Sequence, residues 1–323
     1  MIIIMRNRIK ILICGATGFI GKNLALNLSK NKNYKIYGTF NKSKKYSNKN
    51  INWIKADLTS PIITNKITKN KDIIIQAAAT TSGADDIINR PYLHVADNAV
   101  MNSHLLRSSY INKIKHFIFF SCTVMYNSSD KKIKESHFNP SKELYPKYFG
   151  VAKTKIYVED LCKFYSSISD TKYTCIRHSN VYGPHDKYDL IKSHFFGATI
   201  RKVLEAKDNI QIWGKGSEKR DLLYIDDLVS FVNLCIKKQK KKFDIYNCGL
   251  GKSYSVNSVV RKIVKISNRK LKINNDLTKK SIETKVALDC TKAKQEFNWK
   301  AKTTLSDGIK KTLNWYNKTI ISQ

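Results

Sequence analysis

An apolar run that ends in three evenly spaced glycines constrains this chain more than any other feature. Residues 9–21 read Ile-Lys-Ile-Leu-Ile-Cys-Gly-Ala-Thr-Gly-Phe-Ile-Gly, and a helical pattern begins at Phe19. A short apolar run before a glycine turn predicts a buried parallel strand. The spacing predicts a tight turn at Gly15, close approach of a phosphate at Gly18 and close helix–sheet packing at Gly21. The helix start would then offer free N–H groups and a positive dipole end to a pyrophosphate.

Strand and helix patterns alternate through the first half of the chain. We expect strands at 9–14, 34–40, 51–56, 72–77, 117–121 and 173–178, and helices at 20–29, 91–111 and 148–165. This alternation predicts an α/β fold with a Rossmann-type doubly wound parallel sheet. Ligands of such sheets bind at the carboxyl ends of the strands.

The pattern changes after Asn180, where the predicted elements become shorter and mixed. We expect residues 1–180 to form the dinucleotide-binding domain, with 221–250 rejoining it through a strand at 243–247. Residues 181–220 and 251–323 are expected to form a smaller mixed α/β substrate-binding lobe.

Composition narrows the class of protein. The 323 residues carry a formal charge of +34, but the lysines are spread over the whole chain and no segment combines a basic stripe with a nucleic-acid motif. We therefore expect no nucleic-acid partner. The seven cysteines form no C-x-x-C pair, which argues against a disulfide framework or a metal site. No apolar run approaches membrane-spanning length, so we expect a cytoplasmic protein without a membrane partner.

The end of the second predicted strand bears on the choice of cofactor. Proteins that prefer NAD usually place an acidic residue there, and proteins that prefer NADP a basic one. Here the chain reads Gly-Thr-Phe-Asn-Lys-Ser-Lys-Lys over 38–45, with no acid, and Asn41 and Lys44 are available to a 2′-phosphate. The sequence therefore favours NADP, with NAD as the alternative.

Further motifs resemble one family over nearly the whole length, from about Ile9 to Tyr316. They are the glycine motif, Asp57-Leu58, Ala77-Ala78-Ala79, Arg177-His-Ser-Asn-Val-Tyr-Gly-Pro184, the segment 213–227 and Asn247-Cys-Gly249. Together they resemble extended short-chain dehydrogenase/reductases of the nucleotide-sugar epimerase/dehydratase group. The resemblance implies dinucleotide contacts at Gly15, Thr17, Gly18, Phe19, Ile20, Gly21, Asn41, Lys44, Asp57, Leu58, Ala77, Ala78, Ala79 and Lys153.

Two stretches, 180–194 and 213–227, look most like the GDP-L-fucose synthase group. That group epimerises a 4-keto-6-deoxy sugar nucleotide at C3 and C5 and then reduces C4 with NADPH. The resemblance implies that His194 is the acid of epimerisation, that Arg220 binds the nucleotide diphosphate and that Asn180 contacts the substrate. It also implies a homodimer and a role in making surface-polysaccharide precursors.

The family's Tyr-x-x-x-Lys pair is incomplete. Lys153 has the expected context, but the residue four before it is Phe149, whose ring cannot transfer a proton. Tyr148 is one residue away, a rotation of about 100° on a helix. It could substitute for the missing tyrosine only if the helix start is irregular.

The partner serine of this pair is also missing. Counting back from Tyr126 puts Cys122 in the position of the serine. Counting from the Ser121-Cys122 pair instead makes Cys122 the base partner of the histidine and puts Phe120 in the serine position. A third interpretation makes Cys122 a small buried residue at a strand end.

Three functional interpretations follow. Phe149 is an inactivating change in an ordinary enzyme, or the chain epimerises through Cys122 and His194 without the tyrosine. In the third, the chain is a catalytically impaired protein that binds a nucleotide-sugar or a dinucleotide.

Overall fold

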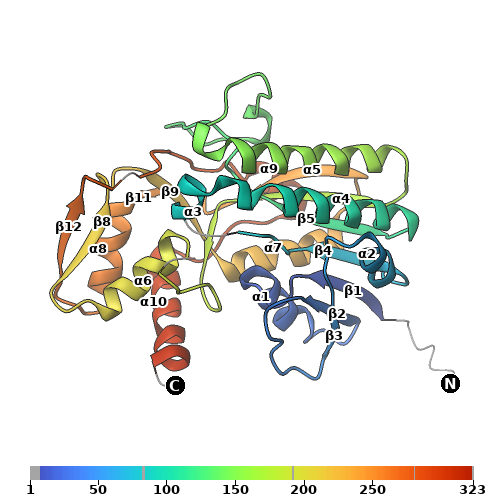
Figure 1. The fold of residues 1–323 in the computed structure, drawn as a ribbon, viewed down its shortest axis with the longest axis horizontal. Coiled ribbons are helices and arrows are strands. Elements are labelled where there is room, and N and C mark those ends of the chain that lie inside the picture. The colour runs from blue at the N-terminus through green and yellow to red at the C-terminus, as the bar shows by residue number, and fades with distance from the viewer. Residues whose placement is uncertain (1–7, 82–83, 191–192, 280, 322–323) are drawn as a thin grey trace.

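A seven-stranded parallel sheet forms the centre of the molecule (Figure 1). A computed structural model describes residues 8–81, 84–190, 193–279 and 281–321. The strand order is β10-β6-β5-β4-β1-β2-β3, and every neighbouring pair is parallel. The strands are β1 (Ile9–Cys14), β2 (Tyr34–Phe40), β3 (Ile51–Lys55), β4 (Ile73–Gln76), β5 (His116–Ser121), β6 (Lys172–His178) and β10 (Phe243–Cys248). This order is that of a doubly wound sheet, which confirms the expected fold class, and β10 rejoins the sheet as predicted.

Helices cover both faces of the sheet. On one face lie α2 (Pro61–Thr68), α4 (Ala96–Ile111) and α5 (Phe149–Ser167), and on the other α1 (Phe19–Leu28) and α7 (Ile225–Lys238). Alternate residues of β1 serve the two sides: Leu12 packs in one apolar cluster, Ile11 and Ile13 in the other. Burial on both faces explains why these strands are continuously apolar.

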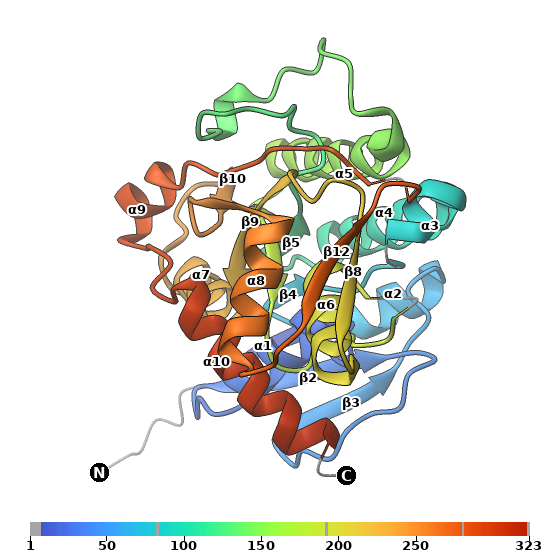
Figure 2. The same cartoon turned by 90° about the vertical axis from the view of Figure 1, so that its left-hand side faces the viewer.

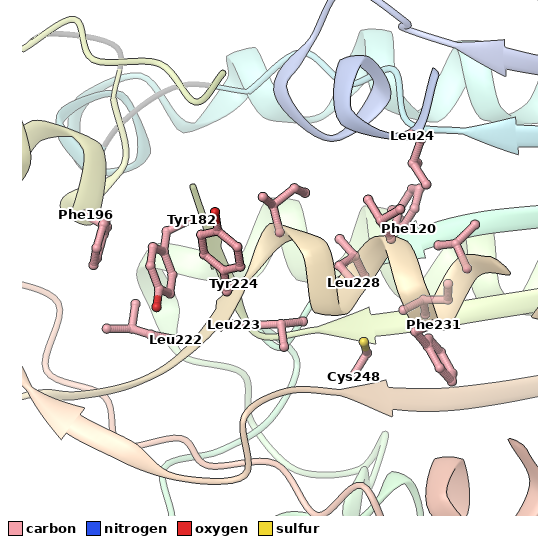
Figure 3. Close-up of a cluster of buried hydrophobic side chains, with 14 of the residues drawn as sticks. Leu24, Phe120, Tyr182, Phe196, Leu222, Leu223, Tyr224, Leu228, Phe231 and Cys248 are labelled. Carbon is pink, nitrogen blue, oxygen red and sulfur yellow. The ribbon is translucent and has the colours of Figure 1, made fainter. Parts of the chain in front are cut away.

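The larger apolar cluster continues from the sheet into the second half of the chain (Figure 3). Leu24 of α1 and Phe231 of α7 pack at one end of it, and Tyr182 and Phe196 at the other. The division into two domains stays a prediction, because this single core joins the sheet to the remaining elements.

Most of the remaining elements lie at one end of the sheet (Figure 2), whereas α9 (Thr291–Phe297) packs against β10 and α7. A three-stranded sheet has the order β11-β9-β7, and β8 pairs with β12. The elements are β7 (Asn180–Tyr182), α6 (Phe195–Glu205), β8 (Asn209–Trp213), β9 (Lys219–Tyr224), β11 (Ser253–Ser255), α8 (Val256–Ile266), β12 (Lys272–Asp276), α9 (Thr291–Phe297) and α10 (Leu305–Tyr316). This mixed lobe stands beside the carboxyl end of the parallel strands, where ligands of doubly wound sheets bind.

The helix expected over 91–111 is wrong as a single element. A 3₁₀ turn at Pro91–His94 is closed by a hydrogen bond from the Val95 N–H to the Tyr92 carbonyl, and α4 begins only at Ala96. A short α3 (Ala84–Asn89) precedes this turn. The tighter turn lets the chain change direction before α4 packs on the sheet.

The longest helix in the described part of the chain is α5, with 19 residues. It carries charged residues on several turns. Within the described ranges, no helix combines the length and the apolar character that crossing a membrane requires.

Candidate active site

The glycine turn after β1 is built so closely that two of its glycines admit no side chain. Gly15 has φ +74°, and a Cβ there would lie 2.7 Å from the Ala78 Cα. A Cβ on Gly21 would lie 2.1 Å from the Gly15 carbonyl oxygen. The Gly15 N–H donates to the Thr39 hydroxyl at 2.9 Å, which ties the turn to β2. The turn therefore packs against both strands that flank β1.

Gly18 differs from the other two because its surroundings are open. A Cβ there would meet only the Gly15 carbonyl oxygen, at the ordinary contact distance of 3.4 Å. Gly18 is the N-cap of α1, with no side-chain cap and no acidic residue in the first turn. Thr17, Phe19 and Ile20 surround this helix start and are partly exposed. Open space beside uncapped helical N–H groups fits a dinucleotide pyrophosphate.

The other predicted dinucleotide contacts follow strands at the same end of the sheet. Ala77, Ala78 and Ala79 follow β4, and Ala78 lies against Gly15. Asn41 and Lys44 are exposed in the loop after β2. Asp57 is exposed after β3, and hydrogen bonds from the Thr59 hydroxyl (2.7 Å) and N–H (3.0 Å) lower its pKa. Leu58 is buried beside it.

The predicted pair Phe149 and Lys153 lies on the outer side of α5. The Phe149 side chain is 56% exposed, and Lys153 is exposed too. The Lys153 ammonium lies 5.8 Å from the centroid of the Phe149 ring. The two residues have the expected spacing and are both exposed, and their role at the cofactor stays a prediction.

Lys155 occupies the inward side of the same helix. Its ammonium donates a 2.7 Å hydrogen bond to the carbonyl oxygen of Phe120, the penultimate residue of β5. Burial lowers the pKa of Lys155, and the nearby Cys122 and Glu159 oppose that effect. The residue four before Lys155 is Val151, which has no hydroxyl group.

A buried ion pair fixes this part of α5 one turn beyond Lys155. Arg177 of β6 donates from Nε and Nη2 to the two Glu159 carboxylate oxygens at 3.0 and 2.6 Å. Its Nη1 donates to the Tyr126 hydroxyl at 3.0 Å, and that hydroxyl donates to Asn247 of β10 at 2.8 Å. The network joins α5, β6, β10 and the segment after β5, and so holds Lys155 in place.

Cys122 lies close enough to both Lys155 and Tyr148 to interact electrostatically with each of them. Cys122 directly follows β5, and burial raises the pKa of its thiol while the Lys155 charge lowers it. Burial also raises the pKa of Tyr148, which the charge of Arg220 lowers and that of Cys122 raises. A 3₁₀ turn at Pro146–Tyr148 precedes α5, so the helix start is irregular. Cys122 is partly exposed as a residue, and its role stays a prediction.

Two histidines complete the group. His194 is the N-cap of α6; its ring is exposed, yet surrounding protein lowers its pKa to about 4. His178 ends β6, and its Nδ1–H donates to the Ser179 carbonyl at 2.8 Å. Burial lowers the pKa of His178 to about 4, and the nearby Lys155 and His194 lower it by smaller amounts.

The predicted substrate contacts lie on adjacent strands. Asn180 of β7 pairs in register with Leu222 of β9, and its side chain donates to the Asp221 carbonyl at 3.4 Å. Arg220 donates from Nη1 and Nη2 to the carbonyl oxygens of Thr284 and Ile282 at 2.8 and 2.6 Å. In the described part of the chain its Nε has no recorded partner. Arg220 is therefore partly engaged by the 282–284 segment.

Sequence reasoning missed Lys155, Glu159 and His178. A signal was present, because Lys155 and Glu159 stand four apart and therefore share one face of a helix. Lys155 faces the sheet and is followed one turn later by Glu159, an acid that Arg177 of a strand can bind. Lys153 does not fit this pattern. In the described ranges, no three His, Cys, Asp or Glu residues gather as they would around a metal ion.

The chain is similar to several known proteins over most of its length. GDP-L-colitose synthase of Yersinia pseudotuberculosis is 29% identical over 314 residues, covering 95% of this chain and 97% of the relative. GDP-L-fucose synthase of Escherichia coli (strain K12) is 22% identical over 263 residues, 76% of this chain and 80% of the relative. The structure of UDP-glucose 4-epimerase with UDP-glucose from Thermotoga maritima has a TM-score of 0.86 at 25% identity, covering 97% of this chain and 100% of that one. The model of the NAD dependent epimerase/dehydratase family matches residues 11–249, and the chain therefore belongs to that family.

Proposed function

We propose that the chain is an NAD(P)-dependent epimerase/reductase of a nucleoside-diphospho-sugar, of the 4-keto-6-deoxy type that the GDP-L-fucose synthase group uses. The observation that carries the proposal is the Lys155 ammonium, bound at the end of β5 and close enough to Cys122 to lower the pKa of its thiol. The names of the relatives support a sugar nucleotide as the substrate class. The products that we propose are precursors of surface polysaccharides.

The residues divide the work between two ligands. The glycine turn and the start of α1 hold the dinucleotide, which supplies hydride chemistry when bound, and Lys155 holds its nicotinamide ribose. Asn180 and the free Nε of Arg220 bind the sugar nucleotide, the arginine through its diphosphate. These residues position the dinucleotide and the sugar nucleotide relative to each other. Positioning supplies a large part of catalysis when a substrate is bound at two ends.

Epimerisation at C3 and C5 needs one group that removes a proton and one that returns it. Cys122 and His194 are the candidates, as base and acid respectively. Burial raises the pKa of the thiol and lowers that of the imidazole, so both groups are neutral at pH 7 in the structure. A bound diphosphate would add negative charge near His194 and so favour the protonated imidazole that an acid requires.

The cofactor preference that we propose is for NADP. The loop after β2 exposes Asn41 and Lys44 and contains no acidic residue, which suits a 2′-phosphate. We place the protein in the cytoplasm, since all seven cysteines are unpaired. We further propose a homodimer that forms through the large apolar side chains exposed on α4 and α5.

One experiment tests the function directly. The purified protein is incubated with NADPH and GDP-4-keto-6-deoxymannose in deuterium oxide, and NADPH absorbance and deuterium at C3 and C5 are followed. We expect both NADPH oxidation and deuterium incorporation. Deuterium incorporation without NADPH oxidation would limit the function to epimerisation. If the ligands bind but neither reaction occurs, the chain is a binding protein.

That binding protein is the second candidate function. The observation that favours it is Val151, since the residue four before the inward lysine lacks the hydroxyl that would protonate O4. Phe149, named above as the site of that loss, faces outward, so Phe149→Tyr should restore nothing. Ligand binding by calorimetry without any exchange or oxidation is the result that this candidate requires.

A further inference from the structure

The side of α5 that carries Lys155 presents a tyrosine after all, one turn earlier than Val151. At about 100° per residue, Val151 projects about 40° from the direction of Lys155, whereas Tyr148 projects only about 20° from it. Lys153 points about 160° away and Phe149 about 120°. The exposure of Phe149 and the burial of the Lys155 ammonium agree with these directions.

The start of α5 is shaped so that Tyr148 belongs to this face. Pro146–Tyr148 form a 3₁₀ turn, closed by a hydrogen bond of 2.8 Å from the Tyr148 N–H to the Tyr145 carbonyl, and the α-helix begins at Phe149. The Tyr148 ring packs on that of Tyr145, with centroids 5.6 Å apart. This packing orients the ring without using its hydroxyl, which has no recorded hydrogen-bond partner in the described part of the chain.

The surroundings of Tyr148 are those of the reacting groups. Its side chain is partly exposed, and Arg220 and Cys122 both lie close enough to affect its pKa. These are the proposed diphosphate contact and the residue next to the sugar. A sugar nucleotide that spans from Arg220 to Cys122 would therefore pass the Tyr148 hydroxyl.

We propose that Tyr148 is the proton donor for reduction at C4 of the sugar, in place of the hydroxyl that Val151 lacks. The proposal rests on the proposed function. The hydride of a reduced nicotinamide dinucleotide forms the new C4–H bond, and the electron pair of the C4=O π bond takes the proton of the Tyr148 hydroxyl. The product is a C4 alcohol, the cofactor is oxidised, and the tyrosinate regains a proton from solvent. The positive charge of Arg220 favours this tyrosinate until then.

The test compares Tyr148→Phe with Tyr145→Phe, which removes a neighbouring phenol on the preceding turn. We expect Tyr148→Phe to lower kcat for NADPH oxidation with GDP-4-keto-6-deoxymannose by about 10²- to 10⁴-fold. Deuterium exchange at C3 and C5 should stay within about twofold, and Tyr145→Phe should leave both rates within the same range. The double variant Tyr148→Phe/Val151→Tyr, which returns a phenol to the position four before Lys155, should recover part of the reduction rate.

A second readout does not depend on turnover. Protein labelled with ¹³C at the tyrosine ring is titrated with GDP-4-keto-6-deoxymannose in the presence of NADP⁺, and the Tyr148 signal is identified by its loss in Tyr148→Phe. We expect this signal to shift on binding. Active Tyr148→Phe protein, or bound sugar nucleotide without a shift, would overturn the role of Tyr148 while leaving the proposed function intact. Absence of sugar-nucleotide binding would remove the proposed function, and this role with it.

Discussion

The Lys155 ammonium donates a 2.7 Å hydrogen bond to the carbonyl oxygen of Phe120, two residues before Cys122. This hydrogen bond connects α5 to β5 of the parallel sheet. Because α5 is also held by the buried ion pair of Glu159 with Arg177, the ammonium has little freedom to move. The functional lysine is therefore defined by which side of α5 it occupies.

The first prediction separates the two lysines. Lys155→Met should lower kcat/KM for NADPH oxidation by about 10²- to 10⁴-fold, because it removes the group proposed to orient the ribose. Lys153→Met should change it less than threefold, since that side chain is exposed on the outer side of α5. Steady-state kinetics of both variants decide the matter, and a loss confined to Lys153→Met would restore the assignment made from sequence.

The second prediction concerns the stability that the buried ion pair maintains. Glu159→Gln leaves Arg177 charged and only partly compensated at 3% side-chain exposure, which should lower the free energy of unfolding by about 3–5 kcal/mol. The matched control is Glu205→Gln, which breaks the exposed pair with Arg201 and should cost less than about 1 kcal/mol. Urea unfolding of the two variants measures both values. Equal losses would mean that burial does not determine the strength of this pair.

The fold could be predicted because its signals are local. Every strand expected in the first half is present within one residue at each end, since a continuous apolar run bounded by turns has few alternatives. The glycine turn was predictable for the same reason, because three glycines alone indicate its backbone conformation. The break before α4 was not, because Pro91 is also a favourable first residue of an α-helix.

The site was harder to predict because it depends on helix direction. Phe149 and Lys153 match a family pattern by spacing alone, and spacing does not say which side of α5 faces the sheet. The sheet decides that, through Arg177 of β6 and its bond to Glu159. The condition set for Tyr148, an irregular helix start, is met by the 3₁₀ turn at Pro146–Tyr148.

The third prediction tests the dinucleotide site through its glycines. Gly18→Ala should keep the free energy of unfolding within about 1 kcal/mol, because the added Cβ finds ordinary contact distances. It should nevertheless weaken NADP⁺ binding at least tenfold, since the methyl group occupies the space of the pyrophosphate. Gly21→Ala should lose both stability and binding, because its Cβ would lie 2.1 Å from the Gly15 carbonyl oxygen. Calorimetric titration with NADP⁺ and thermal unfolding give the two quantities, and unchanged affinity in Gly18→Ala would place the cofactor elsewhere.

The fourth prediction is an acid dependence of stability through His116. Burial lowers the pKa of His116 to about 3 from an ordinary 6.5, while its Nε2 bonds the Thr174 hydroxyl at 2.8 Å. Below pH 6.5 the unfolded chain binds a proton that the native protein does not, so stability falls from pH 6.5 down to about 3 and is fully present above 6.5. The contribution is roughly 1.4 kcal/mol per pH unit at most.

His116→Gln removes that proton difference. The variant should lose stability less steeply than the parent protein between pH 6.5 and 4, although it is less stable at pH 7. His137→Gln, at an exposed position, should run parallel to the parent. Urea unfolding at a series of pH values gives the slopes, and equal slopes for all three proteins would contradict the role of His116.

The last prediction concerns a second copy of the chain. Two packed helices, α4 and α5, expose six large apolar side chains, and Ile168, which directly follows α5, is exposed as well; the six are Val100, Tyr110, Ile111, Phe149, Tyr157 and Phe164. Tyr157, Phe164 and Ile168 recur at helical spacing, so they form one stripe along the outside of α5. The same stripe on a second copy, related by a twofold axis, would be self-complementary and would form a four-helix contact. Phe164→Glu places a charge in the middle of that contact and should convert a dimer to a monomer at micromolar concentration, by sedimentation velocity. Ile62→Glu, on the 79% exposed side chain of α2, is the control and should leave the dimer intact. A parent protein that sediments as a monomer would refute the homodimer.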